Sequence, residues 1–186
     1  MDRGQYNSVT FFISLALCFT LCGCDVLYRF LDKEGAQEKA LIGEITPHEK
    51  NPVVEEVQTL LYLYGYNTGK VDGILGLRTR NAVEKFQEDN GLKPSRFIDQ
   101  ATWQKLNVFT ENKLVIEHQL NVRLIQELLK KAGFDSGSSD GKMGARTKSA
   151  IMKFQEAQGL KADGRVGYQT LNKLAAFIAA EPQTKQ

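Results

Sequence analysis

The chain has 186 residues, and 24 Lys and Arg against 22 Asp and Glu leave a formal net charge of +2. A balance this even argues against a nucleic-acid partner, because nucleic-acid binding usually requires a basic surface. Hydrophobic residues make up 42% of the chain, which argues against a disordered protein. The three cysteines are Cys18, Cys22 and Cys24. The remaining sequence therefore has no disulfide, no thiolate metal site and no cysteine nucleophile.

An apolar run from Val9 to Gly23 lies near the start of the sequence. A transmembrane helix needs about 20 apolar residues, so this run is too short to span a membrane. Its length suits the hydrophobic region of a secretory signal. We therefore predict that residues 1–23 are a signal peptide.

The predicted signal ends in Leu21-Cys22-Gly23-Cys24, which resembles a bacterial lipobox. The resemblance implies that Cys24 becomes the first mature residue and carries a lipid anchor. An ordinary cleaved signal that contains a cysteine is the alternative. Asp25 follows, and in bacteria that resemble enterics an aspartate at this place marks the inner membrane. The expected location is the periplasmic side of the inner membrane, with the outer membrane as the alternative.

Residues 24–50 are predicted to form a lipidated tether, in which 32–39 is charged and compatible with a helix. Asn51-Pro52 is the predicted start of the first long helix. Asparagine is a favoured helix cap, and proline fits the first helical turn.

The chain contains an internal repeat after this helix start. Residues 57–106 align with 125–174 without a gap, and about 21 of 50 aligned positions are identical. The four residues 85–88 recur letter for letter at 153–156. A repeat of this length predicts two copies of one small domain, so that whatever one copy binds, the chain can bind twice.

Each copy is predicted to contain three short helices, because apolar residues recur at three-to-four spacing and glycines follow them. Gly65 and Gly133 end the first helix, and Gly91 and Gly159 end the second. The predicted fold class is all-α, with two tandem small three-helix domains. The boundaries are domain 1 at 51–108, a connector at 109–119, domain 2 at 120–179 and a polar tail at 180–186. The connector is not glycine- and serine-rich, so the two domains are expected to pack on each other.

The repeated pattern strongly resembles the three-helix peptidoglycan-binding domain family. The pattern runs leucine-glutamine, glycine-aromatic, aspartate-glycine, glycine-x-x-threonine, phenylalanine-glutamine and glycine-leucine, and copy two matches it nearly throughout. Copy one departs where Ser95-Arg96 replaces Asp163-Gly164, a favoured turn dipeptide. We expect a reshaped second loop in copy one, and stronger binding by copy two.

The resemblance implies a module that binds the cell wall and is not an enzyme, often attached to a cell-wall hydrolase or transpeptidase. The residues agree, because His48 and His118 are the only histidines and neither has metal-ligand spacing. The segment 135–140 looks superficially like a calcium loop, but Arg146 stands where a bidentate glutamate belongs. No catalytic residue, cofactor or metal is expected.

The candidate ligand-binding residues lie at equivalent places in the two copies. Arg78 and Arg146 suit the carboxylates of peptidoglycan stem peptides, and the alternative is an ion pair with Asp72 or Asp140. Thr79 and Thr147 fall in a first helical turn, where a hydroxyl can satisfy backbone donors. Glutamines such as these more often tie loops to helices than contact a ligand. Tyr62 is expected to have an exposed ring, whereas Tyr64 is expected in the core. The full set is Arg146, Thr147, Asp140, Gln155, Arg78, Thr79, Asp72, Gln87 and Tyr62.

The sequence thus predicts a membrane-anchored lipoprotein of the cell envelope that binds peptidoglycan through two repeated modules. The alternative is a protein–protein adaptor that positions an envelope enzyme. An exposed apolar patch around Tyr62 or on the connector would favour the adaptor.

Overall fold

The computed structural model describes residues 35–44 and 49–178. The predicted signal peptide 1–23, Cys24 and the predicted tail 180–186 lie outside the described residues. Among the helices that are described, none combines the length and apolar composition needed to cross a membrane.

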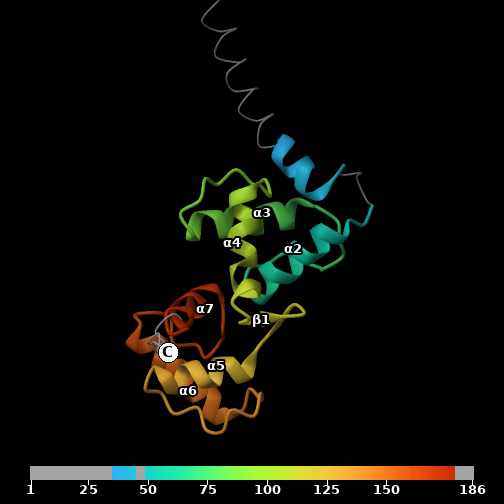
Figure 1. Cartoon of the computed structure of the whole chain (residues 1–186). Helices are drawn as coiled ribbons and strands as arrows, with labels where there is room; N and C mark the ends of the chain where they lie inside the picture. The colour runs from blue at the N-terminus through green and yellow to red at the C-terminus, as the bar shows by residue number, and fades with distance from the viewer. Residues whose placement is uncertain (1–34, 45–48, 179–186) are drawn as a thin grey trace, which may run out of the picture.

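The regular structure of the described chain is almost entirely helical, and α2 to α7 form two groups of three helices (Figure 1). The predicted all-α fold with two tandem three-helix domains is confirmed. The first domain contains α2 (Pro52–Leu63), α3 (Leu77–Asp89) and α4 (Gln100–Glu111). A hairpin of β1 (Val115–Ile116) and β2 (Gln119–Leu120) follows. The second domain contains α5 (Val122–Lys131), α6 (Ala145–Ala157) and α7 (Tyr168–Ala175).

The first helix of each domain begins at an asparagine. Asn51 Oδ1 accepts hydrogen bonds from the backbone N–H groups of Val53 at 2.9 Å and Val54 at 3.2 Å, and proline occupies the first turn. Asn121 Oδ1 accepts in the same way from the N–H of Leu124 at 3.2 Å. These side chains satisfy donors that the helix itself leaves free. The predicted helix start at Asn51-Pro52 is confirmed.

The apolar faces of the helices pack into one continuous core that runs through both domains. Burying one such side chain contributes about 1.5–3 kcal/mol, so this core is the main source of stability. Its fully buried members are Val54, Val57, Leu60, Leu61, Val83, Phe86, Ile98 and Leu106 in the first domain, Leu114 before the hairpin, and Ile125, Leu129, Ile151, Phe154, Leu171 and Leu174 in the second domain.

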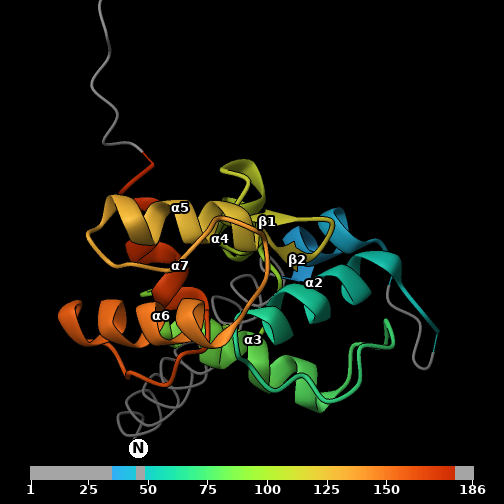
Figure 2. The same ribbon diagram turned by 90° about the horizontal axis from the view of Figure 1, so that it is seen from below.

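Tyr168, at the start of α7, joins the two domains. Its ring lies 5.4 Å from Tyr64, 5.1 Å from Phe86 and 4.9 Å from Phe109, measured between ring centroids, and the residue is only 5% exposed. Seen from below, the two groups of helices lie side by side (Figure 2). Edge-to-face rings of this kind stabilise a contact beyond their buried area. The domains therefore pack on each other, as the sequence predicts.

The residue before Tyr168 brings the two backbones close together. The N–H of Tyr168 donates to the carbonyl oxygen of Tyr64 at 3.3 Å. A Cβ atom added at Gly167 would lie 2.9 Å from that same oxygen. Only glycine fits at this position without moving one domain away from the other.

The connector is ordered rather than a loose linker. α4 continues to Glu111, and the short hairpin turns through Glu117 and His118 with φ angles of 50° and 59°. Two left-handed residues in a row are typical of the tight turn that joins paired strands. His118 Nε2 lies 3.6 Å from Glu56 Oε1 on α2, which places the hairpin against the first domain.

Part of the predicted tether belongs to the first domain. Residues 35–42 are helical, and the Glu38 carboxylate, 4% exposed, accepts from both terminal nitrogens of Arg80 at 2.5 and 2.8 Å. It also accepts from the backbone N–H of Ile98 at 2.8 Å. A bidentate pair that is mostly buried fixes the position of this helix on the domain.

We predict that Gly167→Ala separates the two domains. The added methyl meets the Tyr64 carbonyl, so the free energy of unfolding should fall by about 1–3 kcal/mol, the usual cost of overpacking. Near-ultraviolet circular dichroism should show that the tyrosine cluster has loosened.

The matched control is Gly144→Ala. Gly144 also precedes a helix, but nothing lies within 4 Å of its added Cβ atom. Equal losses from the two substitutions would show that the close contact with Tyr64 is not a constraint.

Candidate functional site

A buried glutamine organises the first loop of each domain. In the first domain, Gln58 Oε1 accepts from the backbone N–H groups of Asp72 at 3.0 Å and Gly73 at 2.8 Å. Its Nε2 donates to Thr79 Oγ1 at 3.0 Å. Gln126 repeats the pattern in the second domain, with the N–H of Gly141 at 2.9 Å and Thr147 Oγ1 at 3.0 Å. These side chains tie the loop to the helix that precedes it.

The threonines at the start of the second helix face the interior. Thr79 and Thr147 are each 2% exposed and accept from the glutamine amide. The expectation that their hydroxyls satisfy free backbone donors of the helix is wrong. Gly76 and Gly144 precede the helices instead, and neither has a side chain to cap them.

The loop aspartates also bond within their own loops. Asp72 Oδ1 accepts from the N–H of Ile74 at 3.0 Å, and Asp140 Oδ1 from the N–H of Lys142 at 2.9 Å. These bonds, together with those from the glutamines, hold the pKa of both carboxyls below their ordinary value. Asp72 and Asp140 are therefore ionised at neutral pH and serve to shape the loop.

A second buried glutamine does the same for the loop between the second and third helices. Gln155 Oε1 accepts from the N–H of Gly164 at 2.9 Å, and Gln87 Oε1 accepts from the N–H of Arg96 at 3.0 Å. Gln87 Nε2 also donates to Ser95 Oγ at 3.1 Å. The interpretation that the glutamines tie loops to helices is confirmed.

The second loop of copy one is not reshaped, contrary to the sequence-based expectation. Arg96 has φ 67° and Gly164 has φ 71°, so the two turns have the same left-handed residue. Arg96 holds this strained conformation because its side chain bonds to Asn81 and lies 3.4 Å from the Glu84 carboxylate. The reason for expecting weaker binding by copy one therefore no longer applies.

The two arginines of the candidate site differ in their partners. Arg146 forms an ion pair with Asp135, not with Asp140 as the sequence-based alternative has it, and both side chains are more than two-thirds exposed. Arg78 is exposed and forms no ion pair within the described residues, so the alternative pairing with Asp72 is also wrong.

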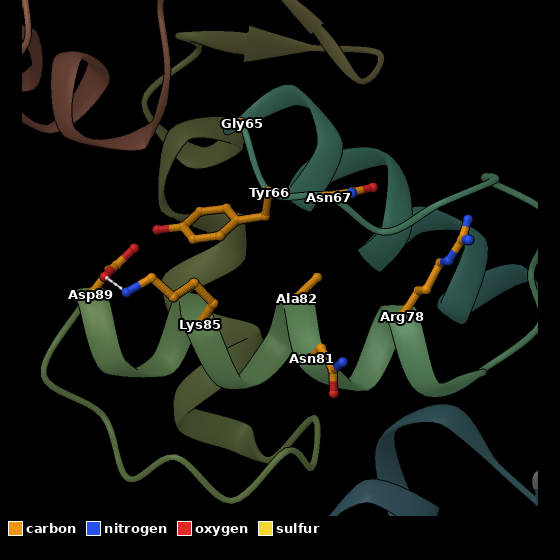
Figure 3. Close-up of a pocket in the computed structure, with 8 residues that line it drawn as sticks. All are labelled: Gly65, Tyr66, Asn67, Arg78, Asn81, Ala82, Lys85 and Asp89. Carbon is orange, nitrogen blue, oxygen red and sulfur yellow. Dashed lines mark hydrogen bonds and ion pairs between the residues drawn. The ribbon is translucent and has the colours of Figure 1, made fainter.

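A groove lies beside Arg78, between the loop after α2 and one side of α3 (Figure 3). Its volume is about 480 Å³. In Figure 3, the Tyr66 ring and the Lys85–Asp89 ion pair lie at one end, Arg78 lies at the other, and Ala82 forms the floor between them. The lining residues are Gly65, Tyr66, Asn67, Arg78, Asn81, Ala82, Lys85 and Asp89.

Two further hollows meet this groove at Gly65 and Tyr66. One, of about 460 Å³, lies between the domains and is also lined by Asp89, Lys161 and Arg165. The other, of about 410 Å³, is also lined by Tyr62 and Arg165. A depression with aromatic and basic side chains therefore crosses from the first domain to the second.

The tyrosines of the first domain have distinct environments. Tyr62 is 67% exposed and Tyr64 is 4% exposed, which confirms both sequence-based expectations. Tyr66 is half-buried in the groove, where burial and the charge of Asp89 raise the pKa of its hydroxyl. The Tyr66 hydroxyl is therefore neutral at physiological pH, and it accepts a hydrogen bond from Asn90 Nδ2 at 3.5 Å.

Sequence reasoning did not predict Lys85 in the groove or Arg165 in the hollows beside it. Arg165 belongs to the second domain and lies beside Tyr66 only because Tyr168 fixes the domains together. Lys85 lies in the repeated segment 85–88, where the sequence shows its identity with Lys153 but gives no signal of its position in the groove.

We predict that Gln58→Leu destabilises the first domain by about 2–5 kcal/mol. The change leaves the N–H groups of Asp72 and Gly73 without their acceptor, and each buried unsatisfied group costs about 1–3 kcal/mol. Denaturant unfolding measures the loss. Gln104→Leu, at an exposed position of α4, should change stability by less than about 0.5 kcal/mol. Similar values for the two variants would contradict the role given to Gln58.

Comparison with known proteins identifies the family of the repeated domain. The family model described as a putative peptidoglycan binding domain matches residues 50–106 and 118–174, together more than half of the chain. The N-acetylmuramoyl-L-alanine amidase CwlM of Mycobacterium tuberculosis is 32% identical over 102 residues. The match covers 50% of this chain and 25% of the amidase, so the chain spans about a quarter of that relative's length. No solved structure matches. The chain belongs to the putative peptidoglycan binding domain family and contains two copies of the domain in tandem.

Proposed function

We propose that this protein is a non-catalytic lipoprotein of the cell envelope that is anchored in a membrane and binds peptidoglycan through its two domains. Family membership supports binding to the cell wall. The lipid anchor is proposed on Cys24 from its lipobox-like sequence. We expect the periplasmic side of the inner membrane, with the outer membrane as the alternative.

The observation that carries the proposal is the depression that crosses the two domains at Tyr66. It combines the Tyr66 ring with the cations Arg78 and Arg165. Peptidoglycan offers both matching chemistries, because its sugars stack on aromatic faces and its stem peptides end in carboxylates, which arginine binds well. Of the nine candidate residues, Arg78 and Tyr62 offer exposed side chains there, whereas Thr79 and Gln87 shape the loops from inside.

A non-catalytic role is consistent with the chemistry of the groove. Asp89 is paired with Lys85 at 2.7 Å, and the pKa of the Asp72 carboxyl is lowered rather than raised. A general acid in a glycan-cleaving pair needs a raised pKa, and the pKa of the Asp72 carboxyl is shifted the other way. The amidase relative is matched over only a quarter of its length, so its activity is not carried over to this chain.

A protein–protein adaptor is the second candidate, with a cell-wall hydrolase or transpeptidase as its partner. Two exposed apolar side chains favour it, Tyr62 at 67% and Ile116 of the hairpin at 47%. Exposed aromatic residues of this kind are common at protein interfaces.

Sedimentation with insoluble peptidoglycan tests the main proposal. The full-length chain should appear in the pellet with sacculi and remain in the supernatant without them. Arg165→Ala should weaken binding at least about tenfold, because losing a charge-assisted hydrogen bond costs about 1.5–3 kcal/mol. Lys148→Ala, an equal change of charge at an exposed position of α6, is the control and should bind normally. A chain that stays in the supernatant would overturn the proposal and leave the adaptor.

Metabolic labelling with palmitate tests the anchor. Wild-type chain and Cys22→Ser should incorporate label, whereas Cys24→Ser should not, because the sulfur that accepts the lipid is gone. Label in the Cys24→Ser chain would show that the lipid is attached elsewhere.

A further inference from the structure

We propose that the first domain contains an open carboxylate-binding site at Arg78, and that the second domain contains the same site closed by its own Asp135. The ligand is a carboxylate of a peptidoglycan stem peptide, so the inference rests on the proposed function. It names which of the two copies holds that carboxylate.

The scaffold of the two sites is the same. The Arg78 side chain lies over Gly69, with its Cδ 3.0 Å from where a Cβ would stand, and Arg146 lies over Gly137 at the same distance. Both glycines are left-handed, with φ 78° and 82°. The two arginines are therefore held along the same path by equivalent loops.

Asn67 and Asp135 occupy equivalent positions beneath these arginines and bond to the backbone in the same way. Asn67 Oδ1 accepts from the N–H of Gly69 at 3.1 Å, and Asp135 Oδ1 accepts from the N–H of Gly137 at 2.9 Å. The turn is preserved, and what differs is one charge.

The charge at this position decides whether the arginine already has a carboxylate partner within its own domain. The second oxygen of Asp135 bonds to the guanidinium of Arg146, and this bond is the main reason that the pKa of the Asp135 carboxyl is lowered. Asn67 has a neutral amide in place of that oxygen. Within the described residues, Arg78 has no carboxylate partner. A ligand carboxylate at Arg78 would take the place that Asp135 fills in the other copy.

The hydroxyl of the next residue along each loop also has a hydrogen-bond partner in the second domain but none in the first. Ser136 Oγ donates to the carbonyl oxygen of Gln126 at 2.9 Å. Its equivalent, Thr68, is 3% exposed, and its hydroxyl oxygen has no hydrogen-bond partner. An unsatisfied buried polar group requires an explanation, and a bound ligand that completes the loop supplies one. The first-domain loop thus leaves two polar groups unused that the second-domain loop satisfies.

The space around Arg78 is large enough for a peptide end. Arg78 lines the groove of about 480 Å³ and also a hollow of about 450 Å³ on its other side. Thr68 and Lys70 line that second hollow. Asp72 lines it as well, so Lys70 and Arg78 against this one carboxylate leave a net positive charge, which favours an anionic ligand over a neutral one.

Exchanging the two residues tests the proposal on the full-length chain. Asn67→Asp should close the first site and lower the affinity for sacculi about three- to fivefold, the effect of an exposed ion pair. Asp135→Asn should open the second site and raise the affinity. Both variants keep the bond to the glycine N–H, so their melting temperatures should match the wild type.

Two further arms assign the effect to Arg78 and to a carboxylate. Arg78→Gln should lose as much affinity as Asn67→Asp, and the double variant should lose no more, because both changes remove one interaction. Sacculi whose carboxylates have been converted to amides should bind the wild type and Asn67→Asp equally weakly.

The outcomes separate this inference from the proposed function. If the wild type binds sacculi but Asn67→Asp binds equally well and Asp135→Asn gains nothing, the inference is wrong and the proposed function stands. If the wild type does not bind sacculi, both are wrong.

Discussion

The constraint on which the rest of the structure depends is the set of four buried glutamines, Gln58, Gln87, Gln126 and Gln155. Each is at most 2% exposed, and each uses its amide oxygen and nitrogen to hold one loop. Burying an amide without hydrogen-bond partners costs several kcal/mol. If a loop moved away, its glutamine would be left in that unfavourable state. Arg96 lies in one of these loops, and Arg78 and Arg146 lie in the first turn of the helices that follow two others. The positions of these arginines therefore follow from the interior of each domain.

A second constraint makes the two domains act as one body. Tyr168 packs against Tyr64, Phe86 and Phe109, and Gly167 allows the backbones to touch. Two modules on a flexible linker bind independently, and the overall affinity rises only through the effective concentration of the second module. Here the two hollows that meet the groove at Gly65 and Tyr66 are lined by residues of both domains, and Arg165 of the second domain lines both of them.

Sequence patterns predicted the features that local rules govern. Asn51-Pro52 marked a helix start, glycines marked helix ends, and apolar spacing placed Tyr64 in the core and Tyr62 outside it. Features that depend on distant partners were missed. Turn rules favour glycine at position 96, yet Asn81, Glu84 and Gln87 hold Arg96 in the glycine conformation. Likewise, the partner of Arg146 is Asp135 rather than Asp140, whose Oδ1 accepts from Gln126 Nε2. Nothing local in the charged segment 32–39 indicates that Glu38 binds Arg80.

The difference between the two copies lies where stability is least sensitive. An exposed ion pair contributes at most about 1 kcal/mol, so exchanging aspartate for asparagine beside the arginine costs the fold little. The same exchange decides whether the arginine is already neutralised when a ligand arrives. A duplicated domain with a glutamine-braced interior can therefore change its binding by one surface charge without losing its fold. Stability measurements would hardly register the difference between Asn67 and Asp135, whereas binding measurements would register it directly.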